Sequence, residues 1–122
     1  MPAKVLVVDD SPDARALYGE YLEFCGFRVE TAADGEEAIA KARAQWPSVI
    51  LMDLAMPRMD GWEAVKQLKQ DPQTKGIPLI MLTAHAFQEH RDRAAQVGAD
   101  AFLAKPVLPD QLAAEIRRVL GL

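Results

Sequence analysis

The sequence predicts an α/β fold in which five parallel strands form a doubly wound sheet of order 2-1-3-4-5. Short apolar stretches alternate five times with stretches of helical spacing, a pattern typical of strand–helix–strand units. Three of the short stretches are continuously apolar, as strands buried on both faces are, and the other two are mixed, as edge strands are. Right-handed connections outward from a central first strand then give the order 2-1-3-4-5.

The predicted strands are short. The continuously apolar ones are Val5–Val8, Val49–Met52 and Leu79–Leu82. The stretch Arg28–Thr31 alternates in polarity and Ala101–Ala104 is mixed, so we place these two at the edges. This order is found in flavodoxin-like (βα)5 proteins, in which ligands bind beyond the carboxyl ends of the strands.

The first helix is predicted after the first strand. Ser11 fits an N-cap, Pro12 suits the first turn, and Gly26 supplies a stop. Its expected core-facing residues recur at helical spacing: Ala14, Leu17, Tyr18, Tyr21, Leu22 and Cys25.

The other helices follow from the same spacing and from helix-breaking residues. The second follows Gly35 and ends at Pro47. Its expected inward face consists of Ala38, Ile39, Ala42 and Trp46. The last three run from about Trp62 to Asp71, from about Phe87 to Val97, and from about Pro109 onward.

Composition excludes several classes of protein. The 122 residues, 50% hydrophobic and 26% charged, make about one globular domain. Cys25 is the only cysteine, which excludes an intramolecular disulfide and a thiolate metal cluster. No stretch suits a membrane span, and the net charge of −4 argues against a broad nucleic-acid surface. We expect a cytoplasmic domain that contacts neither membrane nor nucleic acid directly. Its helical arginines should lie on solvated faces: Arg91, Arg93, Arg117 and Arg118.

Polar residues follow four of the predicted strands. Asp9 and Asp10 follow the first, Asp53 the third, Thr83 the fourth and Lys105 the fifth. Three carboxylates at one end of a sheet repel each other, and one lysine cannot neutralise them. A divalent cation would join them. Since all the candidate ligands are oxygens, we expect Mg²⁺, or Mn²⁺ in its place.

This set of residues also suits phosphoryl transfer. A carboxylate is a competent nucleophile for phosphoryl transfer and would form an aspartyl-phosphate. The hydroxyl of Thr83 and the ammonium of Lys105 would bind phosphoryl oxygens that carry charge during transfer.

The chain resembles the receiver domain of response regulators in two-component signalling systems, of the single-domain, chemotaxis response regulator-like kind. The resemblance runs from Lys4 to about Leu120, so we expect residues 1–122 to form a single receiver domain. The matching pieces stand in order: Asp9-Asp10, Met52-Asp53, Met56-Pro57, Asp60-Gly61, Thr83-Ala84, Gly98 to Asp100 and Lys105-Pro106.

The resemblance implies a role for each residue around the metal. Asp53 is the expected phosphoacceptor. Asp10, Asp53 and the backbone carbonyl of Ala55 are the expected ligands of Mg²⁺, and Asp9 would reach the metal through water.

Further roles follow for the phosphoryl group. Lys105 would pair with it, and Thr83 with the backbone N–H of Ala84 would bind its oxygens. Phe102 falls at the aromatic switch position, and the Lys105–Pro106 bond is expected to be cis. Ala55 and His85 occupy the positions that tune dephosphorylation.

The implied function is a Mg²⁺-dependent phosphoacceptor that assists its own phosphorylation and dephosphorylation without being an enzyme in the usual sense. A histidine kinase or histidine phosphotransfer protein would supply the phosphoryl group from a phosphohistidine. In response, the face formed by the fourth helix, fifth strand and fifth helix would change and bind a downstream protein.

Several alternatives stay open. The chain is compatible with a phosphorelay shuttle, or with a receiver cut from a larger regulator or hybrid histidine kinase. A Mg²⁺-dependent aspartyl-phosphate phosphatase of the haloacid dehalogenase type would need an acid two residues after Asp53, where this chain has Ala55. A flavodoxin-like electron carrier would need a neutral phosphate loop in place of Asp9-Asp10. The intact set of acidic, hydroxyl and lysine residues argues against an unphosphorylated pseudo-receiver.

Overall fold

A single parallel sheet of order β2-β1-β3-β4-β5 organises the chain in a computed structural model, which describes residues 2–54, 61–83 and 88–122. Its strands are β1 (Lys4–Val8), β2 (Arg28–Ala32), β3 (Val49–Asp53), β4 (Leu79–Thr83) and β5 (Ala101–Ala104). The helices are α1 (Pro12–Phe24), α2 (Gly35–Gln45), α3 (Gly61–Gln70), α4 (Gln88–Gln96) and α5 (Pro109–Leu120). The predicted fold class and strand order are confirmed.

Burial distinguishes the central strands from the edges as predicted. Every residue of β3 and β4 is buried, and only Lys4 of β1 is not. In β2 only Ala32 is buried, and no residue of β5 is. Central strands lose contact with water on both faces, which is why their sequences are continuously apolar.

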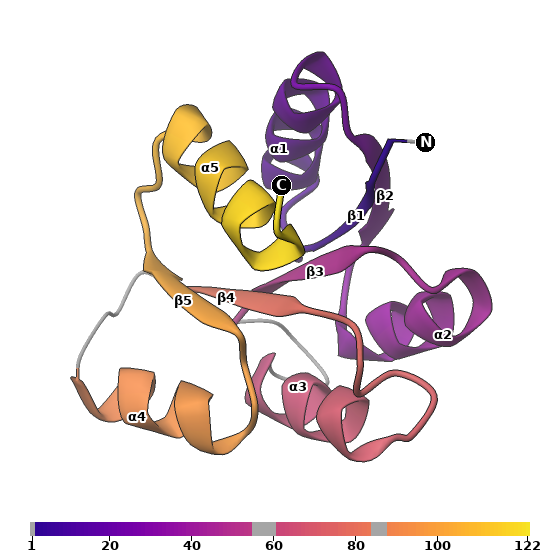
Figure 1. The fold of residues 1–122 in the computed structure, drawn as a ribbon, viewed down its shortest axis with the longest axis vertical. Helices are drawn as coiled ribbons and strands as arrows, with labels where there is room; N and C mark the ends of the chain where they lie inside the picture. Colours follow the sequence, from indigo (N-terminus) through magenta and orange to yellow (C-terminus); the bar gives the residue numbers. More distant parts are fainter. Residues whose placement is uncertain (1, 55–60, 84–87) are drawn as a thin grey trace.

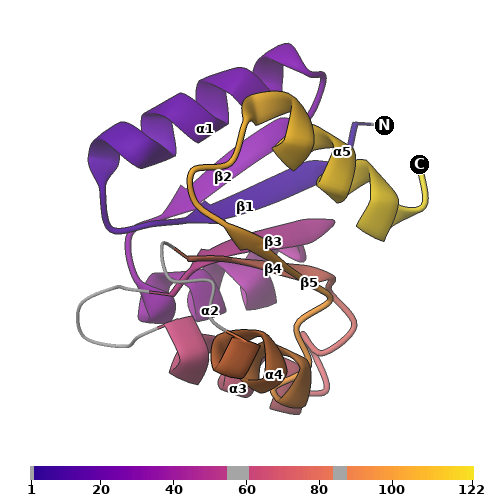
Figure 2. The same ribbon diagram turned by 90° about the vertical axis from the view of Figure 1, so that its left-hand side faces the viewer.

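The helices cover both faces of the sheet, with α1 and α5 on one and α2, α3 and α4 on the other (Figure 1). Because side chains alternate along each strand, one set packs against α1 and α5 and the next against the other helices. In β3, Leu51 belongs to the α1/α5 core and Met52 to the α2/α3/α4 core. Figure 2 shows these two layers of helices from the side.

The first two helices begin at side-chain caps. Ser11 is the N-cap of α1, and its Oγ accepts a hydrogen bond from the Ala14 N–H at 3.2 Å. In α2, Asp34 caps the helix by accepting from the Glu37 N–H at 2.8 Å. Gly26 follows α1 with φ of +97°, a conformation that suits a residue without a Cβ. Among the described residues, no helix is long and apolar enough to cross a membrane.

Two residues predicted on buried helix faces are exposed instead. The buried residues of α1 are Gly19 and Leu22, and Leu17, on the far side of the helix from Gly19, is 67% exposed. Trp46 is 56% exposed because it is the left-handed C-cap of α2, which turns its ring away from the helical pattern. Its indole N–H donates instead to the backbone carbonyl of Gln73. Phe87, predicted to begin α4, lies outside the described residues.

Candidate acidic and lysine site

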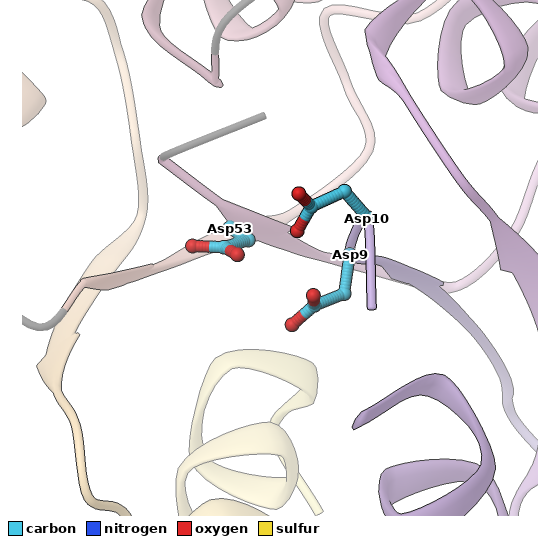
Figure 3. Close-up of side chains that lie close together, drawn as sticks. All are labelled: Asp9, Asp10 and Asp53. Carbon is cyan, nitrogen blue, oxygen red and sulfur yellow. The ribbon is translucent and has the colours of Figure 1, made fainter. Parts of the chain in front are cut away.

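Three carboxylates meet at the carboxyl ends of two neighbouring strands. Asp53 is the last residue of β3, and Asp9 and Asp10 directly follow β1. One carboxylate oxygen from each lies within 4.8 Å of the other two, and Figure 3 shows the side chains together. Asp9 is 3% exposed and Asp53 is 8% exposed, whereas Asp10 faces solvent.

Lys105 reaches this cluster from the far edge of the sheet. Its Nζ lies 3.4 Å from Oδ2 of Asp9 and 3.5 Å from Oδ2 of Asp53. Its backbone N–H donates to the carbonyl of Thr83, the last residue of β4. The Lys105–Pro106 peptide bond is cis, as expected.

The carboxylates also govern the charge of Lys105. Burial by itself lowers the pKa of this ammonium group. The attraction of Asp53, and then of Asp9, more than offsets burial, so the pKa lies above its ordinary value. Lys105 is therefore a permanent cation at neutral pH.

Side-chain alternation explains why Asp9, Asp53 and Lys105 meet. Each lies two positions after a strand residue that packs in the α1/α5 core: Val7, Leu51 and Leu103. Residues two apart point to the same side of a strand, so all three charged groups are directed to one side of the sheet. By the same rule Thr83, two residues after Met81 of the α2/α3/α4 core, belongs to the other side.

Asp9 is fixed by two contacts near the start of α1. Its Oδ1 accepts a hydrogen bond from the Ser11 N–H at 3.0 Å. Its backbone carbonyl accepts from Nη1 of Arg15 at 2.7 Å. The sequence patterns assigned no role to Arg15. The available signal for its contact with Asp9 was its position as a basic residue one turn into the helix that follows the acidic pair.

Gly61 packs against the backbone that carries Asp53. Its N–H donates to the Leu54 carbonyl at 2.9 Å. A Cβ at this position would lie 2.6 Å from the Cα of Leu54 and would also overlap the Asp53 carbonyl oxygen. A glycine is therefore required where α3 begins beside the site.

The remaining predicted residues divide into two groups. Thr83 is buried at the end of β4, and Phe102 is half-buried on β5. Ala55, Ala84 and His85 lie outside the described residues, so their expected roles stay predictions.

The donor set fits a hard divalent cation. Three carboxylates from two strands supply oxygen ligands, which Mg²⁺ prefers, and Asp10 keeps the cluster open to water. Among the residues that the structure describes, Lys105 pairs with two of the three carboxylates, which leaves an excess of negative charge that a cation would offset. The cluster is able to hold a metal ion.

Comparison with known proteins agrees with this geometry. The family model of the response regulator receiver domain matches residues 5–117. Response regulator Rre1 of Synechocystis is 36% identical over 121 residues, covering 98% of this chain and 52% of that protein. The chain thus spans about half the length of the curated relatives it matches.

Solved structures match over almost the full chain. The chemotaxis protein CheY4 of Vibrio cholerae is 42% identical with a TM-score of 0.92, covering 98% of this chain and 99% of that one. The receiver domain of the sensor histidine kinase PA1611 from Pseudomonas aeruginosa is 32% identical with a TM-score of 0.91 and full coverage of both chains. That structure has a magnesium ion coordinated in its active-site cleft.

Proposed function

The chain belongs to the response regulator receiver domain family, a family of signalling domains and not of classical enzymes, and on that premise we propose that Asp53 accepts a phosphoryl group. The donor is a phosphohistidine on a histidine kinase or a histidine phosphotransfer protein. The observation that carries this proposal is the contact of one lysine with two buried carboxylates beside a third, exposed one.

In this reaction, an oxygen of Asp53 attacks the phosphorus atom in line with the leaving imidazole nitrogen. The new O–P bond forms as the P–N bond breaks, and the imidazole nitrogen keeps the electron pair. Lys105, already 3.5 Å from Oδ2 of Asp53, binds the phosphoryl oxygens. The Thr83 hydroxyl and the backbone N–H of Ala84 donate to the same oxygens.

The acidic residues would hold Mg²⁺ or Mn²⁺ through Asp10, Asp53 and the backbone carbonyl of Ala55, with Asp9 acting through a water molecule. When bound, the ion supplies positive charge that offsets the charge of the transferring group. Asp9 also keeps Lys105 in place, since its Oδ2 lies 3.4 Å from the ammonium nitrogen.

Phosphorylation would act on the opposite side of the sheet through Thr83 and Phe102. Phe102 pairs in register with Met81, two residues before Thr83, so both side chains belong to the side of the sheet that α4 covers. As Thr83 moves toward the phosphoryl group, Phe102 would follow into the space it leaves. The face formed by α4, β5 and α5 would then bind a downstream protein.

The phosphodonor would dock on α1 and the chain between β5 and α5. A largely apolar hollow of about 550 Å³ lies there, lined by Leu17, Tyr18, Tyr21, Lys105, Pro106, Val107 and Pro109. Phe24 extends this apolar surface along α1 and is 89% exposed. Because Lys105 lines the hollow and contacts Asp53, a protein seated here would present its histidine beside the acceptor.

We propose further that the domain acts in the cytoplasm. It does so either as a single domain or as the receiver of a longer regulator or hybrid histidine kinase. A relay shuttle and a switch for a downstream protein use the same chemistry and differ in whether the phosphoryl group moves on to a second histidine.

Labelling with a small phosphodonor tests the phosphoacceptor assignment. Incubated with acetyl phosphate and Mg²⁺, the wild-type protein should gain one phosphoryl mass in an intact mass spectrum. The Asp53→Ala variant should gain none, and a chelator should prevent the gain in wild type. Equal labelling of both proteins would refute the assignment.

A further inference from the structure

Two arginine–aromatic contacts join α4 to its neighbours. The guanidinium carbon of Arg91 lies 5.1 Å from the centre of the Phe102 ring on β5. The guanidinium carbon of Arg93 lies 4.5 Å from the centre of the Trp62 ring on α3. At these distances a cation is attracted to the face of an aromatic ring. One helix thus contacts rings from two different elements.

These contacts matter because the part of α4 whose side chains the structure describes buries little else. From His90 to Gln96, Ala94 is the one fully buried residue, whereas its neighbours on the helix are exposed or half-buried. A helix with so small an apolar contact is held weakly, so each remaining contact has a large share in its position. Arg91 and Arg93 are both exposed, yet they lie over rings that pack against the α2/α3/α4 core.

The ring under Arg91 is the one expected to move. Phe102 is half-buried and lies on the same side of the sheet as Thr83, the residue at the end of the neighbouring strand. The guanidinium above the ring stabilises Phe102 in its present position. A ring that has turned inward would lose this cation–π contact, so the guanidinium does not stabilise that position. A contact made in one of two states shifts the balance toward that state.

We propose that Arg91 is a positioning residue that holds Phe102 in its present half-buried position and thereby favours the unphosphorylated state. The inference rests on the proposed function, since it assumes that Asp53 is phosphorylated and that Phe102 turns inward as a consequence. Arg91 thereby determines how readily Phe102 turns inward when Asp53 is phosphorylated.

The expected effect is modest and has a definite sign. Arg91→Met keeps a long side chain but removes the charge, so the resting position of Phe102 loses its contact. An exposed cation–π contact corresponds to a change of about two- to fivefold, so labelling by acetyl phosphate should become faster by that factor. Loss of a positive charge by itself would slow the approach of an anionic donor, so a faster reaction is diagnostic.

The chain offers a matched control in Arg117, whose guanidinium carbon lies 5.6 Å from the centre of the Phe27 ring. Arg117→Met removes the same charge and the same kind of contact, but over a ring of the α1/α5 core, on the opposite side of the sheet from Thr83 and Phe102. Its rate of labelling should equal that of wild type. Thermal unfolding of both variants shows whether they remain folded.

A double-mutant cycle shows whether Arg91 acts through the ring. Phe102→Leu removes the ring, so adding Arg91→Met to this variant should leave the rate unchanged. An accelerated Arg91→Met variant, an unaffected Arg117→Met variant and loss of the effect without the ring together support the proposal.

Three results would overturn it: Arg91→Met at the wild-type rate, equal acceleration by Arg117→Met, or an effect that persists in Phe102→Leu. In each of them wild type is still labelled and Asp53→Ala is not, so the proposed function stands. Absence of labelling in wild type would instead refute the proposed function and this inference with it.

Discussion

The Nζ of Lys105 lies 3.4 Å from Oδ2 of Asp9, although 96 positions separate the two residues in the chain. Asp9 follows β1 and Lys105 follows β5, and β3 and β4 lie between these two strands in the sheet. The ion pair therefore crosses the carboxyl end of the sheet and passes beside Asp53, which ends β3. Lys105 is a cation shared between Asp9 and Asp53, the proposed phosphoacceptor.

Removing the charge of Lys105 should separate metal binding from phosphoryl transfer. In Lys105→Met, the carboxylates lose their cation, so Mg²⁺ should bind more tightly in calorimetric titration. Labelling by acetyl phosphate at saturating Mg²⁺ should slow by about ten- to hundredfold, the equivalent of a lost charge-assisted hydrogen bond. Lys41→Met is the control, because Lys41 pairs with Glu37 on α2. A Lys105→Met variant with wild-type affinity and rate would contradict the proposed role.

Asp10 should strengthen metal binding and weaken the metal-free fold. Asp10→Asn removes a charged oxygen ligand, so the affinity for Mg²⁺ should fall by no less than the roughly ten- to hundredfold that loss of an outer-shell partner causes. Because one of three repelling charges is gone, the metal-free variant should be more stable than wild type by about 1 kcal/mol. Calorimetric titration and urea unfolding measure the two effects. Asp13→Asn, at an acidic neighbour in the first turn of α1, should leave the affinity unchanged and should not raise the stability, because a negative charge there favours the helix; a similar loss of affinity would argue against a specific site.

Gly61 should tolerate no side chain. In Gly61→Ala, the new Cβ meets the backbone of Asp53 and Leu54, so the free energy of unfolding should fall by about 1–3 kcal/mol. Urea unfolding measures this loss. In Gly76→Ala the Cβ would lie 3.7 Å from the Trp46 ring, an ordinary contact, so this variant should differ from wild type by no more than about 0.5 kcal/mol. Equal stability of the two variants would show that the close approach at Gly61 is not a constraint.

Glu37 should make the stability of α2 depend on pH. A hydrogen bond from the Ala33 N–H at 2.7 Å, helped by Lys41 against a smaller opposing effect of burial, lowers the pKa of this carboxyl. A lowered pKa stabilises the fold above the ordinary pKa, and the contribution is lost as the pH falls through the folded-state value. Glu37→Gln keeps the acceptor oxygen and removes the charge. It should be less stable than wild type at about pH 7, by at most about 1 kcal/mol for so exposed a pair, and nearly equal at about pH 3.

Urea unfolding of the two proteins across this range measures the difference, which should also shrink in high salt. A stability difference that stays constant from neutral to acidic pH would show that the Glu37 charge makes no such contribution.

Most of the fold and the centre of the site follow from sequence patterns. Strand polarity was sufficient to predict the order of the strands in the sheet. A strand buried on both faces is apolar throughout, whereas a strand at the edge contains polar residues as well. It was also sufficient to bring Asp9, Asp10, Asp53 and Lys105 to one end, since parallel strands share their carboxyl edge. The predicted third and fourth strands ended one residue too early, before Asp53 and Thr83. A polar residue at the end of a strand resembles the first residue of a loop, so the apolar pattern does not include it.

What the sequence could not predict depends on how elements pack together. Leu17 fits the apolar spacing of α1, but which part of that stripe meets the sheet is set by the position of α1 above it. The arginines of α4 and α5 were predicted to be solvated, and they are exposed; that Arg91, Arg93 and Arg117 also lie over aromatic rings depends on residues far away in the chain. Such contacts have no periodic signature.

The most direct test of the central claim is to locate the phosphoryl group on the labelled protein. After reaction with acetyl phosphate and Mg²⁺, fragmentation mass spectrometry should place a single phosphoryl group on Asp53, the buried carboxylate at the end of β3 that Lys105 contacts. A phosphoryl group on Asp9 or Asp10, or no stable modification under conditions in which the protein binds Mg²⁺, would contradict the account.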